Sequence, residues 1–193
     1  MKAKEIKIIH QGNFLSYYEI LYENPHSELK TYEIVSKQGS KHSKTPPLSL
    51  ESLGQMTQAV VMIVFNKDHS KMLLNKEFRL GVNRYVYNPV AGLIDPGETP
   101  EEAAAREIFE ETGLKLTRII DKLPNAYTCA PVTDEFVPTF ICEAEGKIVD
   151  STNPVEIIHP VWCTKQEARK LLFDKDCRFS GRLQAFVYMW SLE

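Results

Sequence analysis

The sequence has no long apolar run, no excess of basic residues and no repeated segment. A membrane-spanning helix needs about 18 or more mainly apolar residues, and no stretch approaches that length. The first residues, MKAKEIKIIHQGN, are broken by charges and lack the apolar core of a signal peptide. The net charge of −3 gives no basic field that would attract a nucleic acid. These absences predict a cytoplasmic protein with neither membranes nor nucleic acids as partners.

Cysteine and histidine are scarce and scattered along the chain. The four cysteines show no CxxC pair and no Cys/His spacing of the kind that binds metals. We therefore expect four reduced thiols, which is the usual state in the cytoplasm. Cys142 and Cys163 lie in apolar, strand-like runs and are predicted to be core residues. The five histidines do not cluster, and each is predicted to be structural or exposed rather than a ligand.

What the chain does contain is an ordinary globular composition, with 193 residues of which 43% are hydrophobic and 25% charged. That length fits one domain, or one domain with an arm. Alternating or aromatic and β-branched segments predict three short strands, at residues 4–10, 14–22 and 29–37. Residues 38–55 are rich in Ser, Lys, Gly and Pro, which predicts a loop or linker. We therefore predict an N-terminal β arm with its linker at residues 1–55, as a dimerisation element, and a main domain at residues 56–193.

The main domain alternates apolar, β-branched segments with helical patterns. Strands are predicted at residues 57–65, 71–78, 85–90, 116–123, 135–144 and 155–162. Helices are predicted at residues 100–112, 164–173 and 180–191, the second with Thr164 and Glu167 as a capping box. The last helix carries an apolar stripe of Leu183, Phe186, Val187 and Trp190, which predicts a core face. This order predicts an α/β fold with a mixed sheet and helices on its faces.

One stretch, Gly92 to Leu114, has an unusual number of carboxylates and reads GLIDPGETPEEAAAREIFEETGL. A DPG turn precedes a predicted N-cap at Thr99 and a proline at the first helical position. Good helix formers follow, and Gly113 ends the helix. The stretch therefore predicts a loop, a helix and a stop.

Three of these carboxylates share one face of the helix, because residues three and four apart are neighbours: Glu107, Glu110 and Glu111. The opposite side, which we expect to face the core, carries Ala105, Ile108 and Phe109. Like charges on one face repel by a few tenths of a kcal/mol per pair. A divalent cation would compensate this repulsion. The alternative is a solvated acidic face without a ligand.

The same stretch resembles the Nudix box, Gx5Ex7REUxEExGU, where U is a large aliphatic residue. Every fixed position is filled, by Gly92, Glu98, Arg106, Glu107, Ile108, Glu110, Glu111, Gly113 and Leu114. The resemblance implies an α/β/α sandwich with the box helix beside the sheet. It also implies hydrolysis of a nucleoside diphosphate linked to a second group, with Mg²⁺ as cofactor and Mn²⁺ as an alternative.

The resemblance assigns roles to individual residues. Hard divalent cations take oxygen ligands, and the implied ligands are the Ala91 carbonyl, Glu98, Glu107, Glu110 and Glu111. Arg106 keeps its charge at every relevant pH and would orient a glutamate, or form a plain surface ion pair. Arg106 and Glu110 count among the catalytic residues together with Glu135, the candidate general base. Asp134 is the alternative base, and either carboxylate could instead cap a turn.

Three further segments resemble the ADP-ribose pyrophosphatase branch of the family: residues 32–35, 77–79 with 85–95, and 127–135. This implies ADP-ribose as substrate, AMP and ribose 5-phosphate as products, and substrate contacts from Tyr18, Glu77, Arg79 and Pro131. Pro131 lies one place beyond the usual proline of the branch, where Ala130 stands here. Arg79 could instead be a plain surface residue.

The branch also implies a homodimer that exchanges N-terminal arms and uses them to hold the nucleoside. Phe14, Tyr17 and Tyr18 could stack on a base, or form an ordinary strand core. Other substrates of the family stay open, among them GDP-mannose and dinucleoside polyphosphates. A Nudix domain used as a ligand sensor is the alternative from another class of proteins.

Overall fold

The computed structural model describes residues 1–151 and 156–192. The chain forms two compact units. The first, here the N-terminal unit, comprises Met1–Gln58 together with Asn125–Val137. The second, here the main unit, comprises Ala59–Pro124 together with Pro138–Glu193. The segment 125–137 therefore belongs with the N-terminal residues, although it follows the box helix in sequence.

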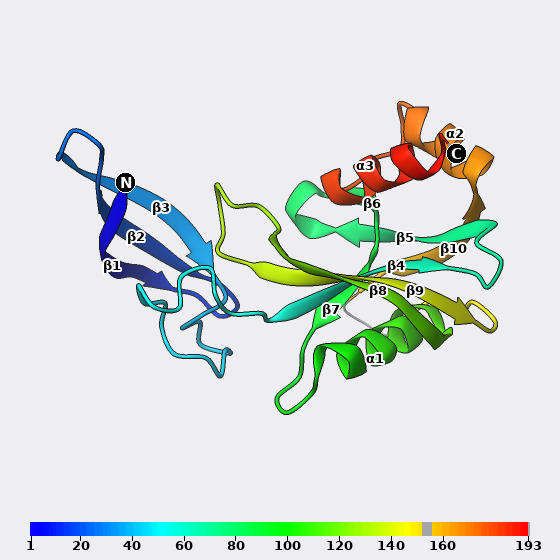
Figure 1. Ribbon diagram of the computed structural model, residues 1–193, viewed down its shortest axis with the longest axis horizontal. Coiled ribbons are helices and arrows are strands. Elements are labelled where there is room, and N and C mark those ends of the chain that lie inside the picture. Colours follow the sequence, from blue (N-terminus) through cyan, green and yellow to red (C-terminus); the bar gives the residue numbers. More distant parts are fainter. Residues whose placement is uncertain (152–155, 193) are drawn as a thin grey trace. The chain divides into compact units, whose positions relative to one another are not determined.

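The N-terminal unit is built on three antiparallel strands in the order β1-β2-β3, namely β1 (Lys2–Gln11), β2 (Ser16–Glu23) and β3 (Leu29–Ser36) (Figure 1). The predicted antiparallel N-terminal sheet is confirmed. Its small core contains Tyr18, Ile20, Ile34 and, from the loop after β3, Leu48. This loop packs on the sheet, and its Leu48 and Leu53 enlarge the small apolar core.

The segment 125–137 is tied to the end of β3 by hydrogen bonds. The N–H of Val35 donates to the carbonyl of Val132 at 2.9 Å. Nε2 of Gln38 donates to Oδ2 of Asp134 at 2.8 Å. The loop that follows the box helix is therefore held by residues from the beginning of the chain.

The main unit contains a seven-stranded sheet with the order β10-β5-β4-β9-β8, in which β6 also pairs with β5 and β7 with β4. The strands are β4 (Ala59–Phe65), β5 (Lys71–Arg79), β6 (Arg84–Asn88), β7 (Val90–Leu93), β8 (Lys115–Tyr127), β9 (Phe136–Glu145) and β10 (Ile158–Thr164). β4 and β9 are parallel, whereas β5 and β7 have antiparallel partners. The sheet is mixed, as predicted.

One predicted strand, at residues 85–90, is two strands in the structure. β6 pairs with β5 as far as Asn88, and β7 pairs with β4 from Val90 onward. Pro89 stands between them and has no N–H to donate to a strand ladder, which explains the change of partner. A short 3-10 helix, Leu80–Val82, connects β5 to β6.

Among the other strands, the ends of β8 and β10 differ most from the prediction, and the remaining ends agree to within two residues. β8 continues through Pro124 to Tyr127, which is tolerated because β8 lies at the edge of the strand order. β10 begins at Ile158. The predicted start, Val155, lies outside the described residues.

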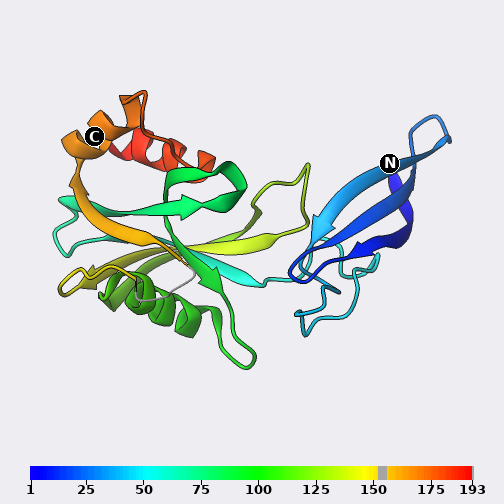
Figure 2. The same ribbon diagram turned by 180° about the vertical axis from the view of Figure 1, so that it is seen from behind.

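All three predicted helices are confirmed: α1 (Pro100–Thr112), α2 (Lys165–Phe173) and α3 (Gly181–Trp190). α1 and α2 each begin with a capping box, formed by Thr99 with Glu102 and by Thr164 with Glu167. In Figures 1 and 2, α1 covers one face of the main-unit sheet, and α2 and α3 cover the other. The predicted α/β/α sandwich is confirmed. Within the described ranges, no helix combines the length and apolar character needed to cross a membrane.

Strand β4 divides its side chains between two cores, because successive side chains point to opposite faces. One core lies against α1 and includes Val60, Met62, Val64, Ala104 and Ile108. The other lies against α2 and α3 and includes Ile63, Phe65, Ala168, Leu183 and Val187. Cys142 is buried in the first core and Cys163 in the second, as predicted, and all four cysteines are free thiols.

Candidate active site

The backbone of β7 lies directly under a carboxylate of α1. Gly92 of β7 pairs with Val60 of β4. A Cβ atom on Gly92 would overlap the carboxyl group of Glu107. Only glycine leaves room for that side chain, so the glycine that opens the box is required by close approach.

Glu111 lies one helical turn beyond Glu107 and is buried, with 6% of its surface exposed. Nδ2 of Asn75, in β5, donates to Oε2 of Glu111 at 2.6 Å. The Ala91 backbone also hydrogen-bonds to this carboxylate. Burial, followed by the negative charges of Glu107 and Glu77, raises the pKa of Glu111 to about 9. Ala91, Glu107 and Glu111, three of the candidate ligands, are thus brought together.

Of the three residues predicted to face the core from α1, only Ile108 does so. Ala105 and Phe109 are exposed, Phe109 to 63%. The buried residues of the helix are Ala103, Ala104, Ile108, Glu111 and Thr112. Glu107 and Glu111 therefore face the sheet and not the solvent. The cause of this orientation lies in the sheet. Gly92 in β7 leaves space for Glu107, and Asn75 in β5 supplies a hydrogen-bond donor to Glu111.

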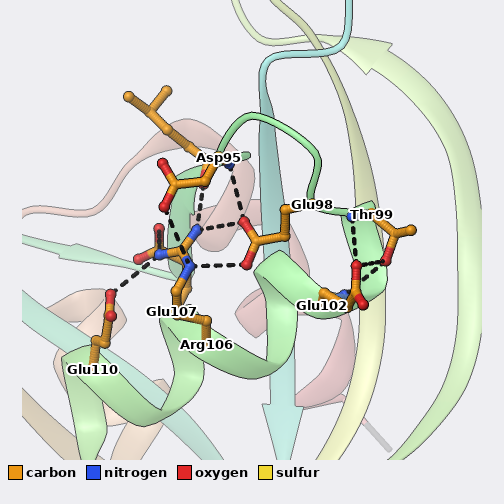
Figure 3. A network of polar contacts seen from close by, with 8 residues as sticks. Asp95, Glu98, Thr99, Glu102, Arg106, Glu107 and Glu110 are labelled. Carbon is orange, nitrogen blue, oxygen red and sulfur yellow. Dashed lines mark hydrogen bonds and ion pairs between the residues drawn. The ribbon is translucent and has the colours of Figure 1, made fainter.

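Arg106 is the centre of an ionic network between α1 and the loop before it (Figure 3). Its guanidinium donates to Oε1 and Oε2 of Glu98, at 2.9 and 2.8 Å, and to the Leu93 carbonyl at 2.8 Å. It also donates to Glu107 at 2.7 Å and to Glu110 at 3.1 Å. These partners, Glu98 above all, raise the pKa of Arg106. Three glutamates of the box therefore share one permanent counter-charge.

The candidate ligands differ in how they are held. Burial raises the pKa of Glu107, although the charge of Arg106 opposes the shift. Both oxygens of Glu98 accept from Arg106, and one also accepts from the N–H of Asp95. The side chain of Glu110 is 57% exposed. Among the described residues, no three Asp, Glu, His or Cys side chains are grouped closely enough to hold a metal ion.

The residues nevertheless fit a hard divalent cation beside Glu107 and Glu111. The donors at this place are carboxylate and backbone oxygens, which such cations prefer. Glu107 rests over bare backbone at Gly92. Oδ1 of Asn75 is buried next to Glu111 and has no hydrogen-bond partner within the described part of the chain. A buried acceptor of this kind calls for an ion or a water molecule.

Glu77 and Arg79 lie at the end of β5. Glu77 is buried, with 7% exposed, and accepts hydrogen bonds from Nδ2 of Asn88 and from Nε of Arg79. Burial raises the pKa of Glu77 despite these partners. The side chain of Arg79 is 56% exposed. Glu77 thus anchors an arginine that remains accessible to a ligand.

Sequence reasoning missed two residues at this site, Glu156 and Asn75. The negative charge of Glu156, just before β10, helps to raise the pKa values of Glu77, Glu107 and Glu111. One glutamate ahead of a strand carries no sequence signal that could have marked it. Asn75 did carry one, because it interrupts the apolar strand KMLLNKEF and a buried amide needs hydrogen-bond partners.

The remaining candidates belong to the N-terminal unit. Glu135 forms a 2.6 Å ion pair with Lys37, and the Pro131 carbonyl accepts from the Tyr32 hydroxyl at 2.7 Å. The roles predicted for Glu135, Asp134 and Pro131 in catalysis or substrate binding stay predictions.

For Tyr18 the structure supports the alternative, an ordinary strand core, and not stacking on a base. Its residue surface is 1% exposed. Its hydroxyl donates to the Gln38 carbonyl at 2.9 Å and accepts from the Leu48 N–H at 3.2 Å. Tyr18 is therefore a core residue with no free ring face. Phe14, in contrast, is 74% exposed and stacks on His42.

Comparison with known proteins gives two kinds of match. Residues 56–180 match the family model described as NUDIX domain. The ADP-ribose pyrophosphatase of Bacillus subtilis (strain 168) is 28% identical over 134 residues, covering 67% of this chain and 70% of that protein. The ADP-sugar pyrophosphatase of Mus musculus is 30% identical over 109 residues, covering 56% and 46%. The chain spans about half the length, or less, of several curated relatives that it matches.

A solved structure matches nearly the whole chain. The crystal structure of an ADP compounds hydrolase superimposes with a TM-score of 0.67 at 19% identity, covering 98% of this chain and 92% of the other. At that identity the likeness concerns the fold.

Proposed function

The chain belongs to the Nudix family, and from this premise we propose that it is a metal-dependent pyrophosphatase that hydrolyses ADP-ribose to AMP and ribose 5-phosphate. The observation that carries the proposal is the complete box, in which Glu107 lies over the Gly92 backbone and Glu111 hydrogen-bonds to Asn75 and to the Ala91 backbone. The substrate is supported by relatives named ADP-ribose pyrophosphatase and ADP-sugar pyrophosphatase. It is also supported by the segments of this chain that resemble that branch.

The residues that would hold the cation are Glu107, Glu111 and the Ala91 carbonyl, with Glu98 and Glu110 as further members of the set. Nudix hydrolases generally need a divalent metal, and we propose Mg²⁺, with Mn²⁺ as its replacement. When bound, such a cation polarises the diphosphate oxygens and lowers the pKa of a bound water.

The chain's own residues would orient the reacting groups. Arg106 joins Glu98, Glu107 and Glu110 through one guanidinium, which keeps these carboxylates in a fixed arrangement. The exposed guanidinium of Arg79 would bind diphosphate oxygens, because its planar fork suits two oxygens at once. Glu77 holds Nε of that arginine and limits its motion.

A general base would take the proton from the attacking water as the phosphorus–oxygen bond to the leaving phosphate breaks. We propose Glu135 for this role, with Glu156 as its rival because its charge acts on the box carboxylates. Glu135→Gln and Glu156→Gln separate the two residues. Replacing the base should lower kcat about 10²- to 10⁴-fold. Replacing the other residue should leave kcat within a few-fold, and equal small effects would exclude both.

A substrate panel tests the proposed function most directly. Full-length protein is assayed with ADP-ribose, GDP-mannose, NADH and diadenosine polyphosphates, each with Mg²⁺ or Mn²⁺, and AMP or GMP release is measured. We expect the highest kcat/KM for ADP-ribose, and no turnover after Glu111→Gln. A higher kcat/KM for another compound would show that this compound, and not ADP-ribose, is the preferred substrate. Tight binding without turnover of any compound would favour a ligand sensor.

We also propose a cytoplasmic homodimer formed through the N-terminal unit. That unit exposes large apolar side chains near the first two strands, including Ile8 at 39%, Ile9 at 47% and Leu15 at 47%. Apolar surface of this kind is commonly covered by a second copy. Analytical ultracentrifugation should give a dimer for the native chain and a monomer for Ile9→Lys. A native monomer at micromolar concentration would exclude the proposal.

A further inference from the structure

Asn75 is a buried amide at the floor of the box, and nothing in the Nudix box calls for it. It follows Leu73 on the same face of β5, where Leu73 belongs to the core beneath α1. Its surface is 0% exposed. Nδ2 donates to Glu111 at 2.6 Å, whereas Oδ1 has no partner among the described residues.

The neighbouring strands do not satisfy this oxygen. In register with Asn75 stand Asn88 of β6 and Pro160 of β10. Nδ2 of Asn88 donates to Glu77, and proline has no N–H to offer. A buried amide oxygen without a partner keeps the full cost of its lost hydration. An unpaired acceptor of that cost is expected where a ligand or water completes the site.

We propose that Asn75 is a positioning residue of the cation site, whose Nδ2 fixes Glu111 and whose Oδ1 accepts a hydrogen bond from a water molecule carried by the cation. The inference rests on the proposed metal dependence. Mg²⁺ keeps several of its waters when bound, and those waters need acceptors. A neutral amide supplies one without adding to the repulsion among Glu77, Glu107, Glu111 and Glu156.

The test measures Mn²⁺ binding to the full-length protein without substrate, by the loss of the free-ion electron paramagnetic resonance signal. Asn75→Leu, which keeps the branching and number of heavy atoms and removes the polar atoms, should weaken binding about 10- to 100-fold. Asn75→Asp should weaken binding less than Asn75→Leu, because the aspartate keeps an oxygen at the Oδ1 position but loses the donor to Glu111. Asn88→Leu is the matched control, since its amide holds Glu77 and not Glu111, and should weaken binding much less than Asn75→Leu does.

A second readout separates positioning from a structural role. At saturating Mn²⁺, water-proton relaxation reports how freely the bound waters exchange. We expect it to change in Asn75→Leu and to remain native in Asn88→Leu. Thermal unfolding without cation shows that each variant is folded, and Asn75→Ala replaces the leucine variant if that one fails to fold.

Three outcomes distinguish this inference from the proposed function. Native Mn²⁺ affinity in Asn75→Leu, or equal weakening in the leucine and aspartate variants, overturns the assignment of Asn75. Absence of Mn²⁺ binding by the native protein overturns both the metal dependence and the inference. If the variants bind Mn²⁺ with the expected ranking but the native protein does not hydrolyse ADP-ribose, the proposed substrate is wrong. The positioning role of Asn75 is then still supported.

Discussion

Helix α1 covers one face of the main-unit sheet, and helices α2 and α3 cover the other (Figure 1). Both layers use the same local chemistry, because α1 and α2 each begin with a Thr/Glu capping box. What they bury differs. The α1 layer buries Glu111 and, in the strand beneath it, Asn75 and Glu77, together with apolar residues. The core beneath α2 and α3 is built from apolar, aromatic and cysteine side chains.

The difference shows how one sheet combines stability with chemistry. Burying carboxylates carries a desolvation penalty, and the pKa values of Glu77, Glu107 and Glu111 are all raised by burial. The opposite core, with Leu183, Val187 and Trp190, is largely apolar, and the carboxylate buried on that face, Glu143, is paired with His69 at 2.8 Å. The α1 face can therefore hold buried carboxylates despite their desolvation penalty, because the other face stabilises the same strands.

The largest expected effect comes from filling the space above β7. Gly92→Ala should lower kcat/KM more than about a hundredfold, because displacing Glu107 by about 1 Å disrupts the site. Steady-state kinetics measure this loss. Gly181→Ala in α3 is the matched control, since a Cβ there meets nothing within 4 Å. Comparable loss in both variants would contradict the role of Gly92.

Leu183→Ala tests the apolar face. Leu183 is 0% exposed, so its truncation should destabilise the protein by about 2–5 kcal/mol. Chemical denaturation measures this, and kcat of the folded variant should stay near the native value. Ile108→Ala, on the α1 face, should lose similar stability and also activity, because it shifts Glu107 and Glu111. Equal kcat in the two variants would contradict the claim that the α1 face, and not the opposite face, carries the active site.

The buried charge of Glu111 predicts a pH dependence in the absence of divalent cations. Its pKa is about 9 in the folded protein, against 4.5 as the ordinary value. The folded state therefore binds this proton more tightly, and the resulting stability is fully present below about pH 4.5 and is lost as pH rises through about 9. Glu111→Gln lacks this loss. Urea unfolding in EDTA measures the free energy of unfolding at pH 5 and pH 9. Between these pH values it should fall more for the native protein than for Glu111→Gln. An equal change in both proteins would refute the raised pKa of Glu111.

The smallest effects should come from the two helix caps. Thr99→Ala and Thr164→Ala each remove a cap hydrogen bond and should cost about 1 kcal/mol of stability. The two variants should differ in their enzymatic activity. Thr99 follows Glu98 of the Arg106 network, so its variant should also lose a few-fold in kcat/KM, while the Thr164 variant should not. Thermal unfolding with kinetic assays on both proteins measures the contrast.

Local signals predicted most of this fold. The capping residues, the glycine stop after α1 and the apolar stripe of α3 correctly placed α1, α2 and α3, because such signals depend on neighbours within a few positions. The strand pattern predicted the N-terminal sheet and most of the main sheet. Its error at residues 85–90 arose because alternation does not show that a strand changes partner at Pro89.

The side chains around the box were harder to predict. Helical periodicity put Ala105 and Phe109 in the core, yet both are exposed. A helical wheel shows which residues share a face, but the sheet decides which face is buried. Glu156 joins the site from a distant part of the sequence, and Tyr18 proved to be core because Gln38 and Leu48 fold over it.

The sequence by itself determined the box, the helix that carries its glutamates and the layered α/β architecture, because spacing, caps and alternation are local properties of the chain. Only the tertiary structure decided that Glu107 and Glu111 face the sheet, that Arg106 joins three carboxylates and that Asn75 lies beneath them. Those relations depend on the close approach of β7 and β5 to α1, and they bring together residues from separate parts of the chain. The first set of features identifies the chemistry, and the second arranges the atoms that would carry it out.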